Sequence, residues 1–263
     1  MRLDKFLAQS AVGKRKEVRL YIKEGKVKVN NIIVEEPSME IDENVDNVEY
    51  LCETIEYVKQ VYYMFNKPMG CITATSDDTH KTVFDFLSKE NAKGIFHVGR
   101  LDKDTEGLLL LTNDGEFEHN LMDPKKHVSK TYFFWAIGSL DYEDINNLQD
   151  GVKIIQGTVL TKPAKIEVCD SGKYEEFKNE IDRLCNKELN INNHPVVSGY
   201  LTISEGCKHQ VKRMLKAVGC YVVYLKRVSI GSVKLDRALK KGEYRLLTEA
   251  EIQILLSHNK KDD

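Results

Sequence analysis

A run of four leucines at residues 108–111 constrains the fold of this chain more than any other feature of its sequence. The run is too short to span a membrane and is bounded by turn residues on both sides, so it predicts a buried strand. The Asp-Gly pair that closes it is a hairpin signal. The charged segment before it, residues 99–106, is then a loop held by a core strand, and it carries Asp102 beside Arg100.

Asp102 has two interpretations that involve no catalysis. An aspartate in a loop commonly bonds its own backbone as a turn or cap residue. A calcium-binding loop is the second, because the acids of residues 102–107 imitate its opening. Such a loop needs a bidentate glutamate at its twelfth position. Counting from Asp102 puts Asn113 there, with leucines where ligands belong, so calcium binding is not expected.

Length and composition indicate a globular chain. Its 263 residues suffice for one large domain or two ordinary ones, and a hydrophobic share of 41% is ordinary. No apolar run reaches the length of a membrane span, and the first residues lack a signal-peptide core. We therefore expect a cytoplasmic protein with no membrane partner. The six cysteines are scattered without a C-x-x-C pair, which fits reduced thiols and predicts neither disulfides nor a metal site.

The charges are segregated along the chain, although the net charge of −2 would argue against nucleic-acid binding. Residues 1–30 carry a net charge of +6, residues 31–60 a net of −8, and residues 200–241 a net of +8. Two basic regions far apart in sequence could form one track for a phosphate backbone. Solvated helix faces would give the same pattern.

Residues 1–58 predict a small domain and its linker. Apolar spacing predicts helices over residues 2–9 and 14–24, and alternation around Asn30-Asn31 predicts a hairpin. The opening Met-Arg-Leu-Asp-Lys-Phe-Leu and the basic second helix resemble the S4 RNA-binding domain. That resemblance implies that the helix binds RNA through Lys14, Arg15, Lys16 and Arg19.

Residues 59–263 predict a second domain rich in strands. An aromatic-rich segment at residues 130–137 is typical of a strand. Within residues 171–198, apolar residues recur at three- and four-residue intervals, which predicts an amphipathic helix in a surface insertion. Thr248 with Glu251 predicts a capping box at the start of a last helix.

Three motifs together resemble the signature of the RsuA-type pseudouridine synthases, which isomerise uridines in ribosomal RNA. They are Asn66-Lys-Pro-Met-Gly70, Gly99-Arg-Leu-Asp-Lys-Asp-Thr-Glu-Gly107 with the leucine run, and Glu205-Gly-Cys-Lys-His-Gln-Val-Lys-Arg-Met214. The resemblance implies an α+β protein: a small S4-like domain, then a catalytic domain with a mixed, mostly antiparallel sheet. It implies no cofactor, because the isomerisation includes no redox or phosphate step.

The resemblance also assigns roles to individual residues. Asp102 matches the family's catalytic carboxylate, and Lys212 matches its basic partner, which would keep the carboxylate charged. Tyr132 matches the tyrosine that stacks on the target base, while Leu201 or Ile203 would form a wall of the pocket. Further residues are expected to contact RNA: Arg100, Lys67, His209, Gln210 and Arg213. No residue is expected to bind a metal.

The opening heptapeptide and the third motif favour the branch that modifies 16S rRNA, at a site of the uridine-516 type. We expect a monomer that acts on ribosomal RNA in a small-subunit assembly intermediate. A synthase for 23S rRNA or tRNA stays open as an alternative, as does a non-catalytic RNA-binding protein of ribosome assembly. A hydrolase would rest on loose carboxylates alone and would release uracil.

Overall fold

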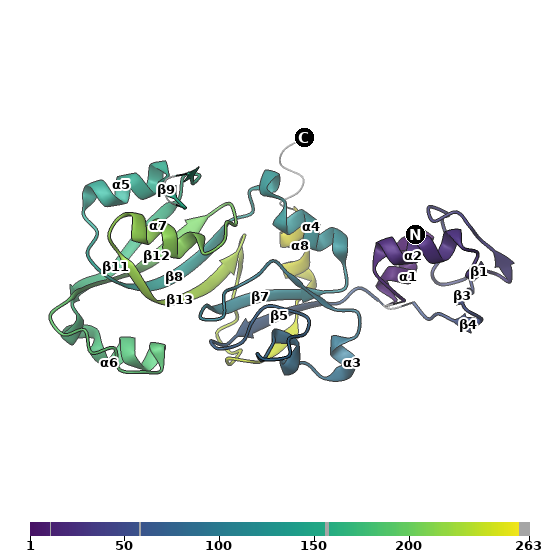
Figure 1. The fold of residues 1–263 in the computed structure, drawn as a ribbon, viewed down its shortest axis with the longest axis horizontal. Helices are drawn as coiled ribbons and strands as arrows, with labels where there is room; N and C mark the ends of the chain where they lie inside the picture. Colours follow the sequence, from purple (N-terminus) through teal and green to yellow (C-terminus); the bar gives the residue numbers. More distant parts are fainter. Residues whose placement is uncertain (11, 58, 156–157, 258–263) are drawn as a thin grey trace. The chain divides into compact units, whose positions relative to one another are not determined.

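The computed structural model describes residues 1–10, 12–57, 59–155 and 158–257 and divides the chain into two compact units (Figure 1). The N-terminal unit comprises Met1–Tyr62 with two later segments, Leu87–Phe96 and Thr112–Asp114. The rest of the chain forms the larger unit. The domain boundary expected at residue 58 falls outside the described residues, so that boundary and the proposed insertion stay predictions.

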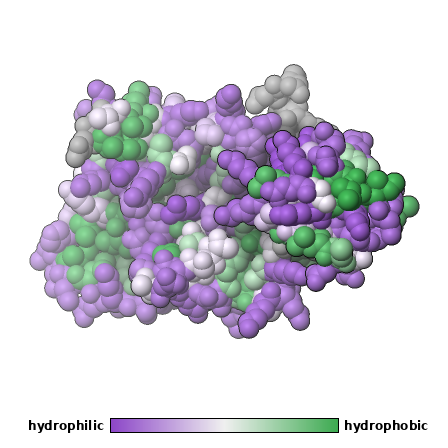
Figure 2. Space-filling model, turned by 45° about the vertical axis from the view of Figure 1, so that its right-hand side comes forward, coloured by the Kyte–Doolittle hydropathy of each residue, from purple (hydrophilic) through white to green (hydrophobic). Residues whose placement is uncertain are grey.

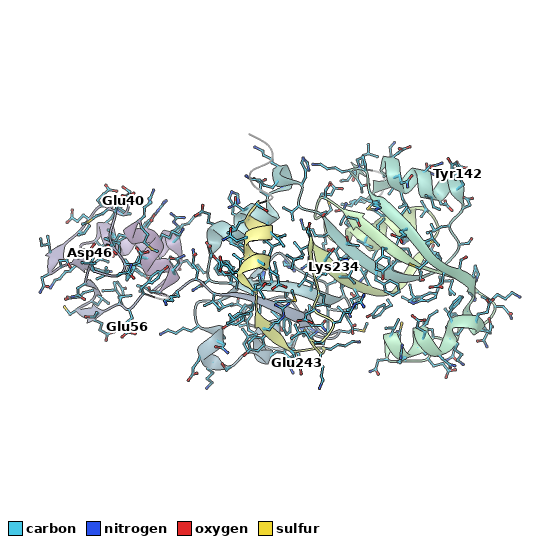
Figure 3. All side chains as sticks on the ribbon, turned by 180° about the vertical axis from the view of Figure 1, so that it is seen from behind. Glu40, Asp46, Glu56, Tyr142, Lys234 and Glu243 are labelled. Carbon is cyan, nitrogen blue, oxygen red and sulfur yellow. The ribbon has the colours of Figure 1, made fainter. Side chains whose placement is uncertain are left out.

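The N-terminal unit contains the two helices and the hairpin that the sequence predicts. Leu3, Phe6, Val18 and Ile22 are buried in its core, and Figure 3 shows acidic side chains around its outside. Its antiparallel sheet has the strand order β2-β1-β3-β4. The elements are α1 (Leu3–Gln9), α2 (Arg15–Lys23), β1 (Val27–Val29), β2 (Ile32–Ile33), β3 (Val48–Tyr50) and β4 (Glu53–Thr54).

The larger unit is organised on a mixed sheet that has nine strands in the described residues. Its main order is β11-β12-β8-β13-β7-β5-β15. The pair β13–β7 is parallel, whereas β11–β12, β12–β8, β8–β13 and β15–β5 are antiparallel, which confirms the predicted class. The strands are β5 (Tyr62–Lys67), β6 (Phe96–Val98), β7 (Glu106–Thr112), β8 (Lys130–Ile137), β11 (Lys165–Lys173), β12 (Pro195–Ile203), β13 (Tyr221–Ile230), β14 (Val233–Lys234) and β15 (Tyr244–Leu246).

Helices pack against this sheet. Helix α7 contacts β13 and α5 contacts β11, while α6 contacts β11 and β13 and lies across the sheet from α7 (Figure 1). The remaining elements are η1 (Val83–Phe86), α3 (Lys89–Ala92), α4 (Gly115–Met122), η2 (Pro124–Lys126), α5 (Tyr142–Asp150), β9 (Lys153–Ile154), β10 (Val159–Leu160), α6 (Tyr174–Cys185), α7 (Gln210–Ala217) and α8 (Glu249–Ser257).

Several local predictions are confirmed. Strand β7 is buried along its whole length. The amphipathic helix is α6, which buries Tyr174 and Ile181 against Trp135 of β8. At the start of α8, Thr248 and Glu251 exchange side-chain and backbone hydrogen bonds, as a capping box requires.

One local prediction is wrong, and it concerns the Asp-Gly pair after the leucine run. Instead of a hairpin, helix α4 begins directly at Gly115. The helical spacing of Phe117 and Leu121, which are both buried, prevails over the turn propensity of the dipeptide. The loop before β7 is thus followed by a strand and then a helix.

Candidate active site

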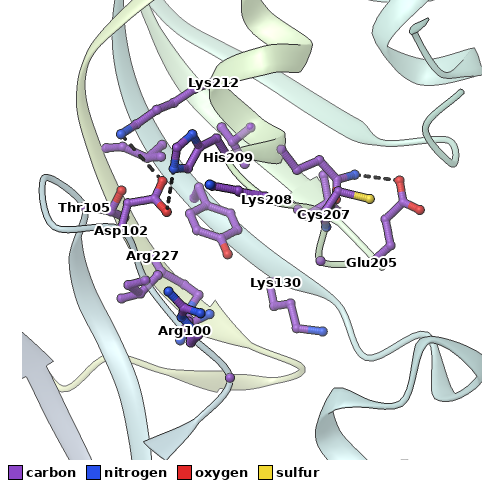
Figure 4. A pocket seen from close by; sticks show the side chains of 18 of the residues that line it. Arg100, Asp102, Thr105, Lys130, Glu205, Cys207, Lys208, His209, Lys212 and Arg227 are labelled. Carbon is purple, nitrogen blue, oxygen red and sulfur yellow. Dashed lines mark hydrogen bonds and ion pairs between the residues drawn. The ribbon is translucent and has the colours of Figure 1, made fainter. Parts of the chain in front are cut away.

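A pocket of about 550 Å³ opens in the larger unit (Figure 4). Its walls come from the loop of residues 99–105, from the strands β8, β12 and β13, and from the start of α7. The expected residues that line it are Arg100, Asp102, Tyr132, His209, Gln210 and Lys212. The fold therefore brings the second and third motifs together around one cavity.

The Asp102 carboxylate faces the side chains of Lys212 and His209 across this pocket (Figure 4). Its Oδ2 lies 3.6 Å from Nζ of Lys212, and its Oδ1 lies 3.5 Å from Nε2 of His209. Lys212 also bonds Asp104; burial raises the pKa of Asp104, but that bond outweighs it and lowers the pKa below its ordinary value. With its side chain 31% exposed, Asp102 is accessible and has the cationic neighbour that the sequence predicts.

The first motif is hydrogen-bonded to the loop that carries Asp102. Lys67 is fully buried, and its ammonium donates to the carbonyl oxygens of Pro68 at 3.1 Å, Asp102 at 3.0 Å and Thr105 at 3.0 Å. The expected RNA contact of Lys67 is therefore wrong, because the ammonium has no exposed surface with which to meet a phosphate. Sequence reasoning missed this role because a lysine after a strand usually points to solvent.

Further hydrogen bonds fix the same loop. The hydroxyl of Thr73 donates to the carbonyl of Leu101 at 2.8 Å and accepts from the Leu101 amide at 3.1 Å. The Gly70 amide donates to the carbonyl of Lys103 at 2.8 Å. The first two motifs thus form one structural element, which limits the movement of Asp102.

Gly107 sets how closely β7 approaches β13. Its φ is +102°, and a Cβ at this position would lie 2.2 Å from the carbonyl oxygen of Arg227. Both the dihedral angle and the close approach require glycine. The parallel pair that carries the pocket floor depends on this residue.

Tyr132 lies on the floor of the pocket with its side chain 9% exposed. Leu201 is its direct neighbour on β12 but is completely buried and is not part of the pocket lining. Ile203, two residues further along the same strand face, lines the pocket instead. Of the two residues expected to form the wall, Ile203 lines the pocket and Leu201 does not.

Gln210 organises the turn before α7. Its amide nitrogen donates to Glu205 at 2.6 Å, and its amide oxygen accepts from the Cys207 backbone at 2.9 Å. The expected RNA contact of Gln210 is wrong in this respect, because both polar atoms are engaged inside the protein. The turn places His209 in a left-handed conformation, at φ +55°, which faces Asp102.

The remaining expected RNA contacts stay predictions. Arg100 is exposed at the pocket, and Arg213 is half-buried on α7 outside the pocket lining. In the N-terminal unit, the four basic residues expected to bind RNA at α2 are exposed: Lys14, Arg15, Lys16 and Arg19.

Sequence reasoning also missed the centre of that N-terminal basic surface, which is the buried carboxylate of Asp4. Arg19 Nε donates to it at 2.7 Å, Arg2 at 3.0 and 3.1 Å, and Arg15 at 3.4 Å. Burial raises the pKa of Asp4, but the three arginines outweigh this effect and hold the pKa below its ordinary value. No spacing rule links these residues in sequence.

Neither a metal cluster nor a helix able to span a membrane is present in the part of the chain that the structure describes. No group of three or more His, Cys, Asp or Glu side chains there could hold a metal ion, and the six cysteines are free. None of the described helices combines the length and the apolar character needed to cross a membrane. Figure 2 shows charged and polar surface interrupted by smaller hydrophobic areas.

Two family models match this chain, and several known proteins resemble it over nearly its whole length. The model of the RNA pseudouridylate synthase family matches residues 61–217, and the S4 domain model matches residues 1–46. The chain is 44% identical to the uncharacterized RNA pseudouridine synthase YtzG of Bacillus subtilis, over 97% of this chain and 98% of that protein. It is 36% identical to the ribosomal small subunit pseudouridine synthase A of Haemophilus influenzae, over 97% and 100%.

Two further relatives cover nearly the full length. The ribosomal large subunit pseudouridine synthase B of Bacillus subtilis is 36% identical, over 97% of this chain and 95% of that protein. The solved crystal structure of a pseudouridylate synthase superimposes with a TM-score of 0.63 at 35% identity, covering 97% of this chain and 99% of that one.

Proposed function

Because the chain belongs to the RNA pseudouridylate synthase family and is an RNA pseudouridine synthase, we propose that it isomerises one uridine of ribosomal RNA. The proposed target is a uridine-516-type site in 16S rRNA, and Asp102 is the catalytic carboxylate. We further propose that the protein works as a monomer in the cytoplasm, on an assembly intermediate of the small subunit.

The observation that carries the proposal is the position of Asp102. Its carboxylate is accessible in the pocket, yet it lies within 3.6 Å of Lys212 and 3.5 Å of His209. An ionised carboxylate can act as a nucleophile, or it can stabilise positive charge that develops on the sugar.

The reaction rearranges atoms within one nucleotide. The bond between C1′ and N1 breaks and its electron pair stays on the uracil; the ring turns, and C5 bonds to C1′. C5 then loses its proton and N1 gains one, so the product is an isomer. Asp102 faces the sugar or the base, and Tyr132 offers a stacking surface for the flipped base at about 1–3 kcal/mol. Arg100, exposed at the rim, would fill the vacated stack or bind a phosphate.

The assignment of the target to 16S rRNA rests on two sequence motifs and not on the percentage identity to relatives. The small-subunit synthase of Haemophilus influenzae and the large-subunit synthase of Bacillus subtilis are both 36% identical to this chain. Identity at this level does not separate the two targets. The opening heptapeptide and the third motif support 16S rRNA, and the exposed basic helix α2 supports RNA binding by the N-terminal unit.

Chemical mapping of pseudouridine in 16S and 23S rRNA from a deletion strain tests the proposal. The strain is complemented with wild type, with Asp102→Ala, or with Asp78→Ala, which changes an exposed acid of the same unit. We expect one 16S site to be lost on deletion and restored by wild type and by Asp78→Ala but not by Asp102→Ala. Restoration by Asp102→Ala would contradict the catalytic role.

Other outcomes separate the alternatives. Loss of a 23S or tRNA site would keep the mechanism and overturn the target. If deletion removed no site in any RNA, while Asp102→Ala and wild type equally restored ribosome assembly, the protein would act as an RNA-binding assembly factor.

A further inference from the structure

The floor of the pocket holds two buried cations that the mechanism above does not use. Lys130 of β8 is 7% exposed, Arg227 of β13 is 2% exposed, and both line the pocket (Figure 4). Arg227 lies directly opposite Tyr132 in the strand register, and Lys130 precedes Tyr132 by two residues on the same strand. Both side chains therefore point to the face of the sheet that carries the proposed stacking tyrosine.

The hydrogen-bonding capacity of these cations is only partly used. Nε of Arg227 donates to the carbonyl of Leu108 at 2.7 Å, but its Nη2 is buried without a partner. Nζ of Lys130 donates to the carbonyl of Val128 at 3.0 Å, although an ammonium has three donors. Among the described residues, neither cation has a carboxylate within ion-pair distance.

The carboxylates of the pocket are engaged elsewhere or lie apart from this pair. Asp102 faces Lys212 and His209, and Glu205 accepts bonds from Gln210 and from a backbone amide. Glu118 also lines the pocket, but it makes no ion pair with either cation. Burial, and then the charge of Arg227, lowers the pKa of Lys130 to about 8, so it still carries a proton at neutral pH. The floor is therefore cationic and not neutralised by the protein.

Buried charge without a partner destabilises a fold, so its presence in a substrate pocket points to an anion of the substrate. The phosphates of RNA are permanent anions on the outside of the chain, and they can be bound by exposed side chains. The uracil ring is different, because it becomes an anion only during the reaction. When C1′–N1 breaks, the electron pair left on N1 spreads to the ring oxygens O2 and O4.

The same charge arises if the carboxylate attacks the base instead of the sugar. A bond from Asp102 to C6 moves the electrons of the C5–C6 double bond onto C5 and O4. The free uracil anion is planar and can stack on Tyr132, whereas the C6 adduct is tetrahedral at C6. In both cases O4 carries negative charge, and the side chains that flank Tyr132 can contact it. The subsequent bond from C5 to C1′ and the proton exchange between C5 and N1 remove the charge again.

We propose that Arg227 and Lys130 form an anion subsite that stabilises the negatively charged uracil ring during the isomerisation. The inference rests on the proposed function and deepens it, because it names the residues that stabilise the negative charge formed on the uracil ring. Asp102 acts as the nucleophile at the sugar or the base, and in both routes the floor cations act on the negative charge of the ring. Such preorganised donors act only on charge that develops in the reaction.

Single-turnover conversion of an RNA fragment tests the subsite in Lys130→Met and Arg227→Gln. We expect the rate to fall by about 100-fold with an unchanged Kd for RNA, as when one donor to a developing anion is removed. Lys165→Met is the matched control, because Lys165 is an exposed lysine of β11 that does not line the pocket, and its conversion rate should not change. A loss confined to the Kd would overturn the proposal and indicate a phosphate site.

A substrate with 5-fluorouridine at the target position separates leaving-group stabilisation from simple positioning. Fluorine withdraws electrons from the ring, so the uracil anion is more stable by itself and needs the cations less. We expect the defect of Lys130→Met, measured as loss of the target nucleotide relative to wild type, to be at least several-fold smaller with the fluorinated substrate. An equal defect on both substrates would overturn the proposal.

Binding of free bases tests the anion subsite without RNA and without turnover. The result is therefore informative even if the proposed RNA target is wrong. Barbiturate resembles uracil but is an anion at neutral pH, and its binding can be followed by NMR titration. Wild type should bind barbiturate more tightly than uracil, and Lys130→Met should lose this preference without a fall in its thermal unfolding midpoint. Equal binding of the two bases by wild type would overturn the inference. If Arg227→Gln does not fold, Lys130→Met alone decides.

Discussion

The two units arrange charge in opposite ways. In the N-terminal unit the buried group is an anion: Asp4 has no exposed surface, and Arg2, Arg15 and Arg19 around it are 42%, 54% and 48% exposed. In the pocket the most buried charges are cations, Lys130 and Arg227.

This difference separates two ways of meeting RNA. The three arginines are neutralised in part by Asp4 and oriented by it, so they form a permanent surface for phosphates without a desolvation cost for each arginine. The floor of the pocket leaves its cations unmatched, which costs stability in the free enzyme. We expect such a loss of stability only where a negative charge that offsets the cations forms during the reaction.

The largest effect is expected at Lys67, which differs from the floor cations because it is a buried cation whose partners are all supplied by the protein. Lys67→Met should remove the ammonium that the carbonyls of Pro68, Asp102 and Thr105 share and cost about 1–3 kcal/mol in the free energy of unfolding. Activity should fall strongly as well, since the loop positions Asp102. Thermal unfolding and single-turnover rates measure the two effects, with Lys103→Met on the exposed side of the loop as control. An unchanged unfolding midpoint would contradict the positioning role.

Asp4→Asn should have the next largest effect, and its pH dependence sharpens the contrast. Because the folded pKa is lowered, the carboxylate stabilises the N-terminal unit above its unfolded pKa of about 3.9, and this contribution is lost as pH falls through the lower folded pKa. Asp4→Asn should remove about 1–3 kcal/mol at neutral pH, less than a fully buried pair because the arginines are half exposed. Between pH 2 and pH 7, a range set by these pKa values, the free energy of unfolding of Asp4→Asn should vary less with pH than that of wild type. Glu35→Gln, which changes an exposed acid, is the control and should vary as wild type does.

The smallest effect is expected for single cations of α2, where the comparison is between Lys16 and Arg19. Lys16→Gln should weaken RNA binding uniformly and lower the salt slope by about 0.7–1 for one lost phosphate contact. Arg19→Gln should do the same and also lower the unfolding midpoint, because Arg19 bonds Asp4 at 2.7 Å. Filter binding at several salt concentrations measures the first effect. Equal midpoints for the two variants would show that Asp4 does not depend on Arg19.

The sequence predicted the elements of the fold better than the partners of its side chains. Strand β7, helix α6 and the α8 capping box follow from periodicity and local hydrogen bonding. Asp102, Tyr132 and Lys212 were predicted as site residues because motifs mark them, and the fold brings all three to one pocket.

The errors share a physical cause. Lys67, Gln210 and Leu201 lie in motifs or beside marked positions, but residue type does not reveal whether a side chain turns inward. The floor cations were missed for the same reason: Arg227 counted as one charge in a basic region, although long-range pairing of β13 with β7 and β8 buries it. Only the register of distant strands contains that information.

The parallel pairing of β7 with β13 also has a consequence for the order in which a newly synthesised chain acquires its properties. The hydrophobic cluster of the N-terminal unit draws on residues 1–57, whereas the pocket floor is incomplete until β13 ends at Ile230. At about 5–20 residues per second, roughly 10 to 35 s of translation separate these points. A chain arrested in this interval would carry an RNA-binding surface without a catalytic centre. Premature termination should therefore yield a competitor for the enzyme's own substrate and not merely an inactive fragment.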